Sequence, residues 1–134
     1  MVFVFVDNVT KGRYAVKVHQ HQEPYRRECA VYRRLMEHAV ERVQGFHVPK
    51  FIHSNDELMV IEMTIVTQPY VLDFAGAYLD TNPEFSEDIW ADWEESRRES
   101  FGARWTIVQR VLVEFESLGV FLLDPSPSNI AFRD

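Results

Sequence analysis

The sequence predicts an α+β fold, in which a small antiparallel sheet with one packed helix is followed by the start of a helical lobe. Three observations carry this prediction. Short runs of β-branched and aromatic residues lie in the first half, one amphipathic stretch interrupts them, and the strongest helical periodicity falls near the end. We expect residues 1–67 to form the sheet with its helix and residues 68–134 to form the partial helical lobe.

The composition indicates a folded chain and excludes some classes of partner. The 134 residues are 46% hydrophobic and 13% aromatic, as in globular domains. The net charge of −7 argues against a nucleic-acid or anionic-membrane binder, because both favour a basic face. The one cysteine, Cys29, cannot form an intrachain disulfide, and the sequence contains no run of apolar residues long enough to span a membrane. We therefore expect a cytoplasmic protein.

The first half of the chain predicts strands around one helix. Turn residues at 7–12 are expected to close a hairpin between the first two strands. A helix is predicted from Pro24 to near Gly45, because apolar residues recur at steps of three and four. The four expected strands are residues 2–6, 14–18, 51–54 and 58–63.

The second half predicts helices. Residues 70–79 are expected to form a short helix. Residues 84–104 are charged, and their aromatic side chains are expected to pack on the chain's own helices rather than on a partner. The clearest helix is residues 103–118, which carry a continuous apolar stripe and end at Gly119.

A rigid loop follows that helix in the segment 122–132, LLDPSPSNIAF, where Asn129 lies five positions after Asp124. Pro125 and Pro127 exclude a helix between them, and apolar runs on both sides anchor the loop. An aspartate that orients a hydroxyl and an asparagine that binds magnesium suit phosphoryl transfer. The alternative is structural, with an Asx turn at the aspartate and capping by the asparagine.

Four further polar positions call for an interpretation. Lys17, in the strand YAVKV, either extends to the surface or faces a partner. Glu28 adjoins the apolar stripe of the predicted helix and could point at the sheet. His19 and His21 could share a metal ion in a strand, but no third ligand with suitable spacing stands nearby.

In their order along the chain, these features resemble the protein kinase-like superfamily, and in particular serine/threonine protein kinases. Residues 14–17, YAVK, are similar to the family's Val-Ala-Ile-Lys strand, and residues 27–35 are similar to the helix that carries its paired glutamate. The spacing of Asp124 and Asn129 is similar to the catalytic loop H-R-D-x-x-x-x-N. The resemblance covers nearly the whole chain.

The resemblance implies a phosphotransferase that uses ATP and magnesium. Lys17 would hold phosphate, and Glu28 would orient Lys17, with Glu23 as the alternative partner of the lysine. Asp124 would accept the hydroxyl proton and Asn129 would ligate magnesium. The backbone of a hinge at Glu62 to Ile65 would bind adenine next to a gatekeeper at Ile61; the implied cofactor-binding residues are Glu62, Met63 and Thr64.

The chain also departs from the family pattern. No glycine-rich loop precedes the first strand, Leu122 and Leu123 replace the histidine and arginine of the loop, and Ser126 replaces a phosphate-contacting lysine. The D-F-G motif would lie beyond Asp134. We therefore expect a domain that is truncated at both ends and inactive alone, unless a missing segment or protein partner completes it. The alternatives are a pseudokinase scaffold and a small α+β interaction protein without a nucleotide site.

Overall fold

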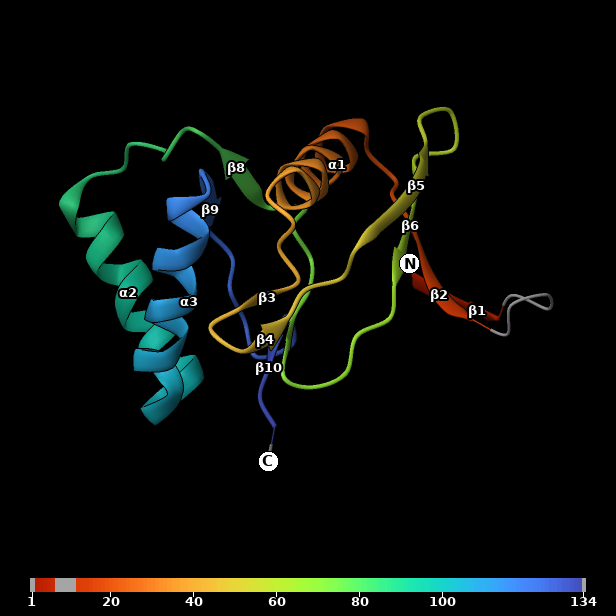
Figure 1. Ribbon diagram of the computed structural model, residues 1–134. Helices are drawn as coiled ribbons and strands as arrows, with labels where there is room; N and C mark the ends of the chain where they lie inside the picture. Colours follow the sequence, from red (N-terminus) through yellow and green to blue (C-terminus); the bar gives the residue numbers. More distant parts are fainter. Residues whose placement is uncertain (1, 7–11, 134) are drawn as a thin grey trace.

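The fold is α+β, as predicted, and Figure 1 shows the computed structural model, in which residues 2–6 and 12–133 are described. A four-stranded sheet lies at one end, two helices lie at the other, and a third helix lies between them (Figure 1). The elements in chain order are β1 (Val2–Val6), β2 (Arg13–Val18), α1 (Gln22–Glu37), β3 (Arg42–Val43), β4 (Phe46–His47), β5 (Phe51–Asn55), β6 (Val60–Thr64), β7 (Tyr70–Val71), β8 (Ala77–Leu79), α2 (Glu87–Phe101), the 3-10 turn Gly102–Arg104, α3 (Trp105–Ser117), β9 (Val120–Leu122) and β10 (Ile130–Ala131).

The large sheet contains the four predicted strands in the order β1-β2-β6-β5, all antiparallel. The turn predicted to join β1 and β2 falls mostly on residues 7–11, which lie outside the described residues. Lys17 lies in the middle of this sheet, where it is paired with Val2 on one side and Ile61 on the other. β1 is the outer strand, and all five of its side chains are at least 43% exposed.

The first helix ends earlier than predicted. α1 stops at Glu37, not near Gly45, because Ala39 adopts a left-handed φ of 52° that no helix tolerates. The residues that were assigned to the last turns of the helix instead form the short hairpin β3–β4. Its turn residues, Gln44 and Gly45, both have positive φ, which is the backbone that tight hairpins require.

The helix predicted at residues 70–79 is wrong, because this segment forms β7 and β8. β7 pairs with β10 and also with β4, and β8 pairs with β9. The partner strands β10 and β9 lie roughly 40 to 60 residues further along the chain than β7 and β8. Local periodicity therefore could not reveal these pairings. Asp73, between the two strands, has a φ of 67° and breaks any helix.

These pairings form an antiparallel ribbon that is interrupted in the middle. β7–β10 and β8–β9 are its two ends, and the loops 72–76 and 123–129 lie opposite each other between them. The backbone N–H of Leu72 donates to the carbonyl of Asn129 at 2.8 Å, which extends one end of the ribbon into the loops. The topology thus places the predicted catalytic loop against residues 72–76.

The predicted helix at residues 103–118 is confirmed as α3, and its apolar stripe is buried. Phe74 joins the helices across the core, because its ring contacts Tyr32 of α1 at 5.3 Å and Phe115 of α3 at 5.7 Å between centroids. Among the described residues, no helix combines the length and the apolar character that crossing a membrane would require.

Gly119 makes a close approach between α3 and β9. Its φ is 79°, and an added Cβ would collide with the ion pair between Arg34 and Asp80. We predict that Gly119→Ala lowers the free energy of unfolding by about 1 kcal/mol more than Gly45→Ala does, since Gly45 also has positive φ but faces open space. Urea denaturation of both variants tests this, and equal losses would contradict it.

Candidate functional site

Lys17 and Glu28 form the ion pair that the sequence predicted. The Lys17 Nζ lies 2.9 Å from Oε1 and 3.2 Å from Oε2 of Glu28. Pleating directs the lysine to the α1 side of β2, and the carboxylate comes from the buried face of α1. Glu23, the alternative partner, instead pairs with Arg27 and has a side chain that is 82% exposed. The roles of Lys17 and Glu28 in binding phosphate stay predictions.

The Glu28 carboxylate is fully buried and has three sources of compensation. Besides Lys17, the ring Nε2 of His19 lies 2.8 Å from Oε1, and the backbone N–H of Phe74 donates to Oε2 at 2.6 Å. A buried carboxylate is tolerated only with such partners. His19 is therefore a structural neighbour of Glu28, whereas His21 is the exposed N-cap residue of α1.

Asp73 is the site residue that the sequence interpretation missed. Its Oδ1 lies 2.9 Å from the Lys17 Nζ and accepts a hydrogen bond from the Ala75 N–H at 3.2 Å. Burial of Phe74 fixes the loop, and the left-handed backbone at Asp73 turns its carboxylate to the lysine. The signal in the sequence was an Asp-Phe pair followed by Gly76, within a stretch assigned to a helix.

Asp124 and Asn129 lie opposite Asp73, where all three line one cavity of about 30 Å³. That volume has room for an ion or for one or two waters, but not for a nucleotide. Asp124 has a side chain that is 82% exposed, and its Oδ1 lies 3.6 Å from Nη1 of Arg97. The same nitrogen donates to the carbonyl of Pro125 at 2.7 Å, so α2 holds the start of the loop.

Three of the four implied hinge residues, Glu62, Met63 and Thr64, are strand residues, and their role in binding adenine stays a prediction. All three lie in β6 and are paired with β2, and β5 lies along the other edge of that strand. Thr64 also donates its backbone N–H to the carbonyl of Lys50 at 2.9 Å. A backbone N–H that is already bonded in a sheet is not free to donate to adenine. The first residue outside the strand is Ile65.

Mutual electrostatics keep Lys17 and Asp73 charged. Burial lowers the pKa of Lys17, but the Glu28 and Asp73 carboxylates outweigh this, and the net pKa lies above its usual value. Burial likewise raises the pKa of Asp73, but the hydrogen bond and charge of Lys17 bring it below its usual value. At neutral pH Lys17 is therefore an ammonium and Asp73 a carboxylate.

The described residues contain no group of three or more His, Cys, Asp or Glu side chains arranged to hold a metal ion. Asp73, Asp124 and the amide of Asn129 offer oxygen ligands only. Such a set suits magnesium, which is commonly bound by one or two carboxylates together with phosphate oxygens and water. The arrangement could thus hold magnesium only together with a phosphate ligand.

Comparison with known proteins gives no relative. No family model, no curated protein and no solved structure matches the chain. The interpretation of the site therefore depends on its own geometry. That geometry brings Lys17, Glu28 and Asp73 into direct contact and places Asp124 and Asn129 at the same cavity as Asp73.

We predict that Glu28→Gln destabilises the fold strongly. The substitution removes the charge that compensates Lys17 and leaves an amide hydrogen facing an ammonium, so the free energy of unfolding should fall by about 3 kcal/mol. Glu23→Gln, on the exposed face of the same helix, should change it by less than about 0.5 kcal/mol. Chemical denaturation of the two variants is the measurement, and similar effects would contradict the importance of Glu28.

We also predict a specific acid dependence of stability. Because the pKa of Asp73 is lower in the folded chain, the unfolded chain takes up its proton first as pH falls. The contribution of Asp73 is complete above its unfolded pKa, near 3.8, and is lost as pH falls through the folded pKa.

Asp73→Asn should therefore flatten the decline in the free energy of unfolding between roughly pH 5 and pH 2. Asp92→Asn, at an exposed position of α2, should leave that decline unchanged. Urea denaturation across this pH range compares the variants with the unmodified chain. A slope that Asp73→Asn does not alter would show that Asp73 has the same pKa in both states.

Proposed function

We propose that this cleft binds the phosphate end of ATP together with magnesium, and that the chain is a protein kinase-like phosphotransferase domain. One observation carries the proposal. Lys17 contacts Glu28 and Asp73 at once, and Asp73 shares a cavity with Asp124 and Asn129. Phosphoryl transfer needs this combination of a cation for phosphate, carboxylate and amide ligands for magnesium, and an acceptor for the hydroxyl proton.

Lys17 is suited to hold a phosphate oxygen. Its side chain is 17% exposed, so it is oriented by its neighbours but still reaches solvent. Glu28 keeps it positioned from the buried side. A phosphate would compete with Asp73 for the ammonium, which would free the Asp73 carboxylate for a metal.

Asp73 would take the part of the magnesium-binding aspartate of the family's D-F-G motif, although it precedes the catalytic loop in sequence. It is followed by Phe74 and Gly76. Its side chain is 42% exposed, and it lines the same cavity as Asp124 and Asn129 of the loop 123–129. The interrupted ribbon explains how a residue before the loop could serve, since pairing of β7 with β10 brings the two segments together. Asn129 would supply the second ligand.

Asp124 would orient the acceptor hydroxyl and receive its proton, while ATP with magnesium would supply the phosphoryl group. Its exposed carboxylate can be reached from solvent. We assign the adenine to the hinge backbone at Ile65, because this implied hinge residue lies outside β6, whereas the implied gatekeeper Ile61 is buried within it.

A second candidate function is nucleotide binding without turnover, as in a pseudokinase. One observation favours it, namely the ion pair that Arg97 makes with Asp124 at 3.6 Å. A carboxylate engaged by a guanidinium is less free to orient an acceptor hydroxyl. Measuring phosphate release from ATP beside nucleotide binding separates the two candidates.

We predict that ATP with magnesium raises the melting temperature of the chain by several degrees. Ligand at about one hundred times its Kd adds about 2.7 kcal/mol to the free energy of unfolding. Lys17→Met should abolish the shift, and Asp73→Asn should remove its dependence on magnesium. Lys50→Met, which changes an exposed lysine at another edge of the sheet, is the matched control and should keep both.

Thermal unfolding with ATP, with magnesium and with both together provides the measurement. No shift at millimolar ATP in a folded sample would overturn the proposed function. A shift that Lys17→Met retains would place the nucleotide elsewhere on the molecule.

A further inference from the structure

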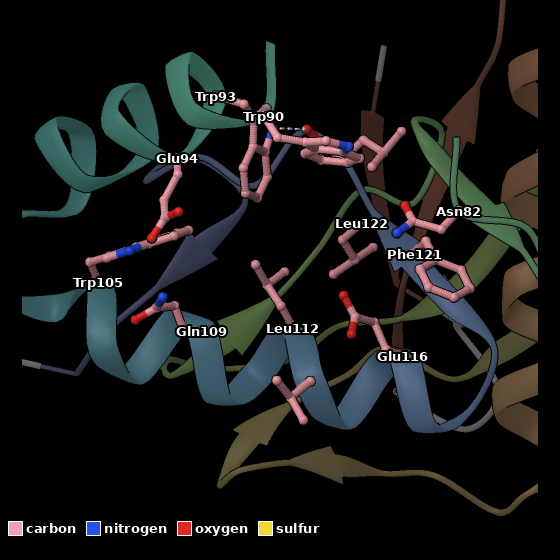
Figure 2. Close-up of a pocket in the computed structure, with 12 residues that line it drawn as sticks. Asn82, Trp90, Trp93, Glu94, Trp105, Gln109, Leu112, Glu116, Phe121 and Leu122 are labelled. Carbon is pink, nitrogen blue, oxygen red and sulfur yellow. Dashed lines mark hydrogen bonds between the residues drawn. The ribbon is translucent and has the colours of Figure 1, made fainter. Parts of the chain in front are cut away.

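A cavity that lies away from Lys17 is bounded by α2, α3 and β9. Its volume is about 300 Å³, at the lower end of the range for small-molecule sites. All three tryptophans of the chain line it. Figure 2 shows the residues of its wall, which include Trp90, Trp93, Glu94, Trp105, Glu116 and Phe121.

The tryptophans form walls that meet at steep angles. The ring of Trp93 is inclined at 84° to Trp90, with 5.7 Å between centroids, and at 69° to Trp105, with 6.0 Å between centroids. Each ring has an electron-rich face, and the three tryptophans line the cavity together. A cation held against such faces within about 6 Å is attracted by their quadrupoles.

Two carboxylates add negative charge to these walls. Glu94 extends from α2 and Glu116 from α3 into the space between the helices (Figure 2). Glu94 pairs with Arg98 at 3.1 Å, but both side chains are largely exposed and such a pair is weak. Glu116 makes no ion pair within the described part of the chain, and no Lys, Arg or His is among the described residues that line the cavity.

The cavity also contains an unmatched hydrogen-bond donor. Trp105 is 5% exposed, and its indole N–H finds no acceptor among the described residues. Buried donors are nearly always paired, so an unpaired one in the wall of a cavity indicates a missing partner. A ligand with a hydroxyl oxygen would provide the acceptor.

A purely structural role explains only part of this arrangement. Trp105 packs in the core, and Trp93 donates from Nε1 to the carbonyl of Leu123 at 2.8 Å, so both contribute to the fold. Packing alone does not account for a cavity of about 300 Å³, for two carboxylates beside it, or for the unpaired N–H.

We propose that this cavity binds a small organic cation, namely a free quaternary or methylated ammonium compound that also carries a hydroxyl group. The aromatic faces would hold the methylated ammonium, Glu116 and Glu94 would supply the charge, and the hydroxyl oxygen would accept from Trp105. The proposal does not rest on the phosphotransfer function. Leu122 and Leu123 line both this cavity and the one at Asp124, so the two sites are neighbours.

Choline is the probe, and intrinsic tryptophan fluorescence is the readout, because every tryptophan of the chain lies at the cavity. Titration with choline chloride, against sodium chloride at equal ionic strength, should give a saturable change in emission. Its neutral isostere 3,3-dimethylbutan-1-ol, which has the same shape without the charge, should bind at least tenfold more weakly. Glu116→Gln should raise the Kd for choline at least fivefold, whereas Glu95→Gln should leave it unchanged.

Three outcomes would overturn the proposal. One is the absence of saturation at tens of millimolar choline in a chain that circular dichroism shows to be folded. Another is equal binding of choline and the neutral alcohol, which would indicate an apolar pocket. The third is tenfold tighter binding of a capped trimethyl-lysine tripeptide, which would point to a protein ligand. Because none of these measurements uses ATP, failure here and failure of the nucleotide site are distinguishable.

Discussion

The buried carboxylate of Glu28 is the interaction on which the arrangement of the molecule depends. It brings together β2 through Lys17, the residue that follows β2 through His19, a helix through its own backbone, and a loop through the N–H of Phe74. A charge removed from water needs all these partners, so the three segments cannot separate without exposing an unpaired ion. The same contacts hold Asp73 near Lys17. Structural and proposed functional requirements therefore meet at one side chain.

The interrupted ribbon is the second constraint, because it decides which loops face each other. β7 and β8 lie on one strand path and β10 and β9 lie on the other, so the residues between them are forced into opposition. Asp73 comes from one loop, and Asp124 and Asn129 come from the other. Neither loop needs intrinsic order, since paired strands hold both at their ends, Phe74 holds the first loop, and Arg97 holds the start of the second.

The sequence pattern predicted those strands and helices whose formation depends on residues close together in the chain. Runs of β-branched and aromatic residues identified the four strands of the large sheet, and the stripe along α3 identified that helix. The pairing of Lys17 with Glu28 was implied by the resemblance to kinases, because the residues alone left a surface position open for Lys17. Asp73 and the β7–β8 segment were not predicted, because their partners lie far along the chain and strands of two or three residues have no period. The early end of α1 depended on a left-handed Ala39, which no propensity indicates.

The exposed edge of β1 has a consequence for the behaviour of the molecule in solution. Its valines and phenylalanines offer apolar side chains on both faces of an outer strand, a surface on which another strand can be added. The net charge of −7 opposes this, since copies of the chain repel each other. At 0.1 M, salt screens the repulsion between charges that lie more than about 10 Å apart, but it leaves the apolar attraction. Colloidal stability is therefore set by ionic strength, with dilute buffer favouring dispersed chains.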